Sequence, residues 1–325
     1  QWRSYGVLIN PPAQIEHAFK VMGGPATLVI TPPEDRGTTA ASLVGAVESC
    51  LATLERRYSR YLADSLVSTI NRAAGGGDFT RLDPESEALL EIADQLWQSS
   101  GGLFDITSGV LRKAWRFDAA KAPVDLSQLE TLQNKVGWDK VERTSEGVYL
   151  PIEGMEIDLG GLVKEYAADC AVRLLRDQGV TSGLIELAGD VATIGCQPSG
   201  VPWRVGIRAP QGGEPLGGIA LSNAAAATSG NYARTLRFEG RTYGHLLNPQ
   251  TGWPVEGPTS VTVIGENCLS AGAVSTIACL QSSEAAEAWL SEAGLPWLMI
   301  GPDAGCSGPL ASGGRLASER GLTRP

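Results

Sequence analysis

Short apolar segments that end at glycine or proline alternate with longer segments of helical periodicity along the 325-residue chain. The run ATLVIT at 26–31 is β-branched and stops at two prolines, which is typical of a strand followed by a turn. Residues 39–58 repeat Leu and Val at helical spacing, which predicts an amphipathic helix. Because 40 glycines supply many turns, the pattern favours a mixed α/β protein over a helical bundle.

The same periodicities place the other elements of one domain at 22–303, between a polar lead-in at 1–21 and a loose Gly/Ser/Arg-rich tail at 304–325. Asp83 as N-cap and Pro84 as first residue predict the start of one helix. A hairpin is expected at Glu239–Gly240. Further helices are expected at 84–99, 269–280 and 283–293, and further strands at 182–195, 203–210, 260–266 and 296–301.

Charge and cysteine usage exclude several classes of protein. The 26 Lys and Arg against 36 Asp and Glu give a net charge of −10, which disfavours binding to nucleic-acid backbones or anionic lipid. No run approaches the roughly 18 apolar residues of a membrane span. The six cysteines are widely spaced, so zinc is disfavoured, while one or two disulfides stay open. With two histidines, any metal must be held mainly by oxygen, as Mg²⁺, Mn²⁺ or Ca²⁺ are.

Three segments carry chemical content. The segment DLGGLVKEYAAD at 158–169 contains a carboxylate, two glycines and the start of a helix. This pattern is typical of a site that binds a phosphate or a phosphate-bound metal, and also of an ordinary glycine turn with Asp158 as the helix N-cap. His245 in YGHLLNPQTGWPV suits a general base, or a structural hydrogen bond. The hydroxyls of ATSGNY at 227–232 and LSAGAVSTIA at 269–278 suit phosphate or Mg²⁺, or helix caps. Neither a dinucleotide loop, a phosphate loop nor a GxSxG elbow is present.

Taken in order, these segments resemble the FAD:protein FMN transferase family, often called ApbE, from Met22 to about Ile300. The pieces that carry the resemblance are SRYLADS…IN (59–71), GGLFDIT (101–107), WRF (115–117), DLGGLVKEYAAD (158–169), LAGD (187–190), WRVGI (203–207), ATSGNY (227–232), GHLLNPQTGWPV (244–255), SVTVI (260–264) and AGAVSTIA (271–278).

The resemblance implies a single α/β domain with a deep cleft for FAD, and transfer of FMN from FAD to a Ser or Thr hydroxyl of a partner protein. AMP would leave, with assistance from Mg²⁺. His245 matches the catalytic histidine of the family, and Thr276 its metal-binding threonine, with further metal ligation from the backbone near Gly161 and Val163. The segments expected at the FAD site contain Met22, Tyr61, Asp158, Lys164, Asp190 and Thr228.

This sequence departs from the family pattern at three positions. Gly272 stands where the late-helix pattern A-D-A-x-[AS]-T has Asp, Asn248 stands where HIIDP has Asp, and Glu165 follows Lys164 where KG is usual. Glu165, Asp158 or Glu186 are candidates to replace the missing carboxylates. Three functions therefore stay open: the flavin transferase, a non-catalytic flavin-binding or delivery protein, and an FAD pyrophosphatase that transfers FMN to water.

The resemblance also implies a location and a partner. Family members work outside the cytoplasm, so we expect a periplasmic protein or a lipoprotein anchored on the outer side of a bacterial inner membrane. The expected partner is a flavin-acceptor protein of a membrane electron-transfer system. A chain that begins at Gln1 fits removal of an export signal as well as a shortened form, and a lipid anchor would lie outside it.

Overall fold

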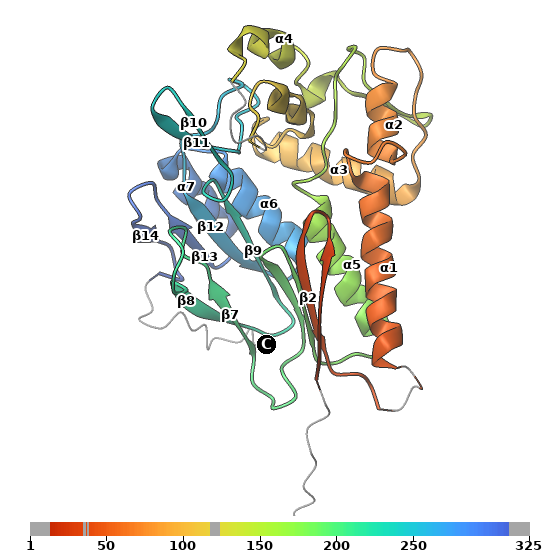
Figure 1. The fold of residues 1–325 in the computed structure, drawn as a ribbon, viewed down its shortest axis with the longest axis vertical. Helices are drawn as coiled ribbons and strands as arrows, with labels where there is room; N and C mark the ends of the chain where they lie inside the picture. The colour runs from red at the N-terminus through yellow and green to blue at the C-terminus, as the bar shows by residue number, and fades with distance from the viewer. Residues whose placement is uncertain (1–13, 35–36, 38, 118–123, 312–325) are drawn as a thin grey trace, which may run out of the picture.

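A computed structural model describes residues 14–34, 37, 39–117 and 124–311 (Figure 1). Its centre is an eight-stranded sheet with the order β1-β2-β5-β6-β9-β12-β13-β14, and each neighbouring pair is antiparallel. The strands are β1 (Ile15–Val21), β2 (Gly24–Ile30), β5 (Gly183–Leu187), β6 (Asp190–Ile194), β9 (Ala225–Gly230), β12 (Ser260–Gly265), β13 (Trp297–Ile300) and β14 (Cys306–Ser307).

Helices and three small strand pairs surround this sheet. The α-helices are α1 (Ala40–Tyr58), α2 (Leu66–Arg72), α3 (Pro84–Ser99), α4 (Leu129–Gln133), α5 (Val163–Asp177), α6 (Cys268–Cys279) and α7 (Ser283–Ala293), and the 3-10 helices are η1 (Ile106–Lys113), η2 (Leu126–Gln128) and η3 (Trp138–Lys140). The small pairs are β3 (Glu142–Thr144) with β4 (Gly147–Tyr149), β7 (Trp203–Ile207) with β8 (Gly217–Leu221), and β10 (Thr235–Phe238) with β11 (Arg241–Gly244).

Helices cover one face of the sheet, and the β7–β8 hairpin packs on part of the other. Helices α5 and α6 pack on one face, and α1 packs on α5, as Figure 1 shows. Because side chains alternate along a strand, Leu28 and Ile30 of β2 lie in the large core with these helices. Their neighbour Val29 instead packs toward the cluster of the β7–β8 hairpin, around Trp203. The mixed α/β class predicted from the sequence is therefore confirmed.

The local signals placed several elements correctly. Helix α3 begins at Pro84, and the Asp83 carboxylate accepts the backbone N–H of Ser86 at 2.8 Å, as an N-cap does. Helix α7 has the predicted bounds, 283–293. The hairpin between β10 and β11 turns at Glu239 and Gly240, with φ of 49° and 79°. Two successive positive φ values are what a two-residue hairpin turn requires.

Two expectations for the chain ends need correction. Residues 15–21, expected in a polar lead-in, form the edge strand β1, and its half-buried side chains alternate with exposed ones because one face of the sheet is solvated there. In the expected tail, β14 adds a last strand at 306–307, and residues 312–325 lie outside the described part. In the described ranges, no helix combines the length and the apolar character needed to cross a membrane.

Candidate functional site

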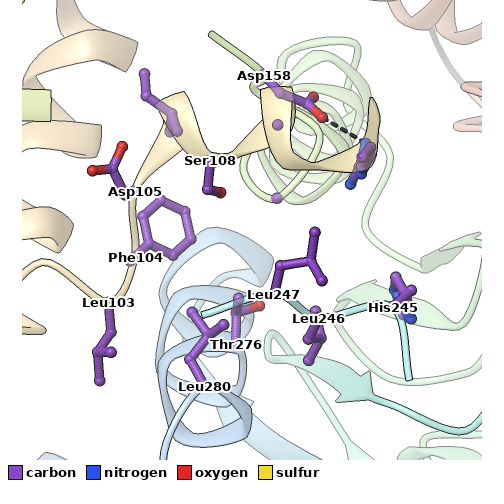
Figure 2. Close-up of a pocket in the computed structure, with 14 residues that line it drawn as sticks. Leu103, Phe104, Asp105, Ser108, Asp158, His245, Leu246, Leu247, Thr276 and Leu280 are labelled. Carbon is purple, nitrogen blue, oxygen red and sulfur yellow. Dashed lines mark hydrogen bonds and ion pairs between the residues drawn. The ribbon is translucent and has the colours of Figure 1, made fainter. Parts of the chain in front are cut away.

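An open pocket lies where η1, the segment before α5, the segment after β11 and helix α6 meet (Figure 2). It brings together four of the residues predicted for the site, Asp158, Gly161, His245 and Thr276. The other lining residues are Leu103, Phe104, Asp105, Ile106, Ser108, Gly109, Arg112, Leu246, Leu247 and Leu280. An apolar wall with few polar groups is typical of a small-molecule site.

His245 is the titratable group of the pocket with the clearest perturbation. Its Nδ1 atom is buried and has no hydrogen-bond partner among the described residues. Burial lowers the pKa of His245 to about 4, and the positive charges of Arg234 and Arg112 add to this effect. At neutral pH the imidazole is therefore uncharged, so it can accept a proton from a reacting group.

Asn231 fixes the segment that carries His245. Its Oδ1 atom accepts the backbone N–H of Leu246 at 3.0 Å, and its side-chain amide donates to the carbonyl of Val255 at 3.3 Å. Gly244 allows this approach, since a Cβ there would lie 2.3 Å from Asn231 Oδ1. Asn231 lies inside the motif ATSGNY, but sequence reasoning singled out only the hydroxyls of that motif.

Asn248, which stands where the family pattern has Asp, has a structural role. Its Oδ1 atom accepts the backbone N–H groups of Gln250 at 2.8 Å and Thr251 at 3.2 Å. An aspartate would accept the same two bonds, because both side chains form such turns. The indole N–H of Trp115 closes the loop by donating to the carbonyl of Gly252 at 2.8 Å.

Asp158 is held by two arginines that sequence reasoning did not identify. Its Oδ2 atom accepts from Arg112 Nη1 at 2.7 Å, the contact dashed in Figure 2, and from Arg60 Nη1 at 3.2 Å. Its Oδ1 atom accepts the N–H of Gly160 at 2.9 Å. Asp158 is not the N-cap of α5, which begins after Leu162 without a side-chain cap. The carboxylate therefore orients Arg112 at the pocket wall.

Three other predicted residues, which do not line the pocket, form a hydrogen-bonded network around the buried Asp190. Asp190 is 1% exposed; its Oδ2 atom pairs with Lys164 Nζ, and its Oδ1 atom accepts the N–H of Thr228 at 3.0 Å. The Thr228 hydroxyl in turn lies 2.9 Å from that of Thr262. Both carboxylate oxygens of Asp190 are thus satisfied by the protein itself.

The Asp190→Asn variant should be less stable than the wild type by about 1–3 kcal/mol, because Lys164 loses a buried charged partner. Urea unfolding followed by circular dichroism measures this difference. Glu186→Gln is the matched control, since half-buried Glu186 lies on the neighbouring strand β5 and should change stability by no more than about 0.5 kcal/mol. Equal stability of Asp190→Asn and the wild type would contradict a stabilising role for this pair.

Met22 and Tyr61 lie outside the residues that line the pocket. Met22 forms the turn between β1 and β2 with a positive φ of 53°. Tyr61 is 79% exposed, and the guanidinium of Arg60 lies 5.9 Å from its ring centroid. Since Arg60 also binds Asp158, Tyr61 is linked to the pocket through one residue.

Three hydroxyl groups cluster at the α6 side of the site. The Thr276 hydroxyl lies 2.8 Å from the Ser229 hydroxyl, which lies 2.9 Å from that of Ser275. Gly161 also lines the pocket, and Val163 begins α5 without lining it. Across residues 14–34, 37, 39–117 and 124–311, no group of three or more His, Cys, Asp or Glu side chains could hold a metal ion. A cation here would need hydroxyl and backbone oxygens in addition to a carboxylate.

Comparison with known proteins gives one consistent result. The model of the ApbE family matches residues 22–299. The FAD:protein FMN transferase of Chlamydia pneumoniae is 31% identical over 261 residues, 78% of this chain and 81% of that protein. That of Escherichia coli K12 is 28% identical over 274 residues, 80% of this chain and 77% of that protein.

Solved structures agree in fold. The flavin transferase ApbE of Vibrio cholerae superimposes with a TM-score of 0.82 at 23% identity, over 92% of this chain and 97% of that one. The ApbE protein of Thermotoga maritima gives 0.82 at 25% identity, over 91% of this chain and 97% of that one.

Proposed function

The chain belongs to the ApbE family, and from this we propose that it is an FAD:protein FMN transferase. FAD is the substrate, and a protein is the acceptor of the FMN group. The observation that carries this proposal is the pocket that joins an uncharged His245 to the Thr276 hydroxyl and to Arg112. These groups supply a proton acceptor, an oxygen donor and a positive charge, which are what transfer of a phosphoryl-linked group needs.

The proposed transfer breaks one phosphoanhydride bond and forms one phosphoester bond. The hydroxyl oxygen of an acceptor Ser or Thr attacks the phosphorus of the FMN half of FAD. The bond from that phosphorus to the bridging oxygen breaks, and AMP leaves with the bridging oxygen. The hydroxyl proton passes to the imidazole of His245, while Arg112 favours the anionic diphosphate near the pocket wall.

We also propose that Mg²⁺ assists, because the donors of this chain fit a hard cation. The Thr276 hydroxyl and the backbone oxygens near Gly161 and Val163 are oxygen ligands of the kind that Mg²⁺ accepts. Nearby, the Oε2 atom of Glu165 is buried without a hydrogen-bond partner among the described residues, as a carboxylate ligand without its cation would be. When bound, the cation would neutralise charge on the phosphoryl oxygens.

The pKa of His245 gives the transfer a characteristic pH dependence. The uncharged imidazole is the active form, and its pKa is lowered to about 4, so protonation should inactivate the free enzyme only as the pH falls toward 4. We expect kcat/KM for FAD to show no histidine inflection between about pH 5 and 8. Steady-state rates across this range test this, and an inflection near 6.5, the ordinary histidine value, would contradict it.

The reaction is tested by following AMP. Purified protein is incubated with FAD and detergent-solubilised membrane proteins, with and without Mg²⁺, and AMP is measured by chromatography. AMP release that requires Mg²⁺ and the acceptor fraction is expected. AMP release matched by free FMN would indicate the pyrophosphatase, and tightly bound, intact FAD would indicate the flavin-binding protein.

For the partner and location, we propose an acceptor that belongs to a membrane electron-transfer system, and action on the outer side of a bacterial inner membrane. The support is the resemblance to exported proteins and lipoproteins of this family. Protease treatment of intact spheroplasts tests the location, because a protein on the outer side would be degraded while a cytoplasmic control protein stays intact.

A further inference from the structure

We propose that Glu165 of α5 is the charged ligand of the cation, and that it occupies the space that a side chain at position 272 of α6 would fill. This inference rests on the proposed function, since it assigns a ligand for the cation of that reaction. It identifies a binding residue that lies on a different helix from the aspartate of the family pattern.

The first observation that supports this proposal is the packing of Glu165 against Gly272. A Cβ atom at Gly272 would lie 2.5 Å from Glu165 Cγ, 3.2 Å from Cδ and 3.3 Å from Oε1. The first of these distances is far below van der Waals contact, so an aspartate at 272 would require the side chain of Glu165 to move from its observed position. Glycine within a helix is unfavourable, but here it makes room for the glutamate.

The second observation is the hydrogen bonding of the Glu165 carboxylate. The residue is 6% exposed, and its Oε1 atom lies 3.2 Å from Lys164 Nζ. Its Oε2 atom has no partner within the described part of the chain. A buried carboxylate oxygen without a hydrogen-bond partner lowers the stability of the fold. A cation bound at Oε2 would therefore explain why this chain has a glutamate at position 165.

The other candidate carboxylates are already engaged. Asp158 accepts hydrogen bonds from Arg60, Arg112 and Gly160. Asp190 accepts hydrogen bonds from Lys164 and Thr228. Glu186 accepts the N–H of Gly189 at 2.5 Å through Oε1. Glu165 is therefore the candidate that combines burial with an unused oxygen.

The third observation is the position of Thr276 on helix α6. Gly272 and Thr276 are four residues apart on α6, so they lie on the same face, one turn from each other. The Glu165 carboxylate packs on this face at Gly272, and Thr276 lines the pocket. A carboxylate and a hydroxyl on one helix face form a donor pair suited to Mg²⁺ or Mn²⁺.

The test measures cation binding directly. The purified protein is titrated with Mn²⁺, and the signal of free Mn²⁺ is followed by electron paramagnetic resonance. We expect Glu165→Gln, which keeps the shape of the side chain, to weaken Mn²⁺ binding about 10-fold or more. Glu266→Gln is the matched control, because Glu266 is exposed and precedes α6, and its Mn²⁺ affinity should equal that of the wild type.

A paired substitution keeps the test independent of folding defects. Gly272→Asp alone places a side chain in occupied space, so its melting temperature should fall. Glu165→Gly with Gly272→Asp removes the clash and returns a carboxylate to α6, so both melting temperature and Mn²⁺ affinity should recover toward the wild type. Unchanged Mn²⁺ affinity in Glu165→Gln, or no Mn²⁺ binding by the wild type, would overturn the inference.

The binding assay separates this inference from the proposed function. Loss of Mn²⁺ binding in Glu165→Gln supports Glu165 as a ligand even if the wild type transfers no FMN. Transfer by the wild type together with unchanged Mn²⁺ binding in Glu165→Gln supports the function and rejects the ligand.

Discussion

Replacement of His245 by alanine should lower kcat for FMN transfer by about 10²–10⁴-fold, the range that a general base contributes. The Kd for FAD should stay within a few-fold of the wild type, because the pocket keeps its apolar wall and Arg112. Single-turnover transfer assays give the rate, and quenching of flavin fluorescence gives the affinity.

The second histidine of the chain provides the matched control. His17 lies on β1 and pairs with Glu48 at a distance of 3.0 Å, and it is not among the pocket residues. His17→Ala should therefore transfer FMN at the wild-type rate. Transfer at the wild-type rate by His245→Ala would reject His245 as the base, and an equal loss in both variants would indicate a general structural effect.

Trp115→Ala should destabilise the protein by about 3–5 kcal/mol, the usual cost of removing a buried tryptophan. Trp115 is fully buried, and its ring lies 5.0 Å from that of Trp253 and 5.7 Å from that of Tyr243. Its indole N–H also holds Gly252 of the loop after His245. Urea unfolding followed by circular dichroism gives the loss, and a loss below about 1 kcal/mol would contradict this role.

Trp115→Phe separates packing from hydrogen bonding. Phenylalanine keeps an aromatic ring in the cluster but cannot donate to Gly252. The loss of stability should therefore be clearly smaller than in Trp115→Ala, including about 1 kcal/mol for the hydrogen bond. If the two variants were equally unstable, the hydrogen bond rather than the ring would hold the loop.

Local signals in the sequence were sufficient for most helices and for the hairpin. Asp83 and Pro84 define the start of α3 through contacts within one turn, so no knowledge of the rest of the fold is needed. The sequence does not reveal strand β1, because half of its side chains are exposed and the rest only half-buried, so its composition resembles that of a polar loop. Its identity depends on pairing with β2.

In the site, too, local sequence patterns identify some residues, while tertiary packing alone brings the others together. The motifs predict one site that contains His245, Thr276, Asp158 and Gly161, and these four residues line one pocket. The motifs could not reveal that Arg60 and Arg112 converge on Asp158, because 98 and 46 residues separate them and only tertiary packing joins them. The contact between Glu165 and Gly272 was hidden for the same reason, although both departures were visible in the sequence.

The destination of the FMN group tests the central claim most directly. The purified protein is incubated with FAD, Mg²⁺ and solubilised membrane proteins. The acceptor proteins are then denatured and digested, and the flavin-modified peptides are identified by mass spectrometry. The account predicts an intact FMN group joined through its phosphate to a Ser or Thr side chain, and far less of this peptide in the same time when His245→Ala replaces the wild type. Free FMN as the sole flavin product of the wild-type protein would contradict it.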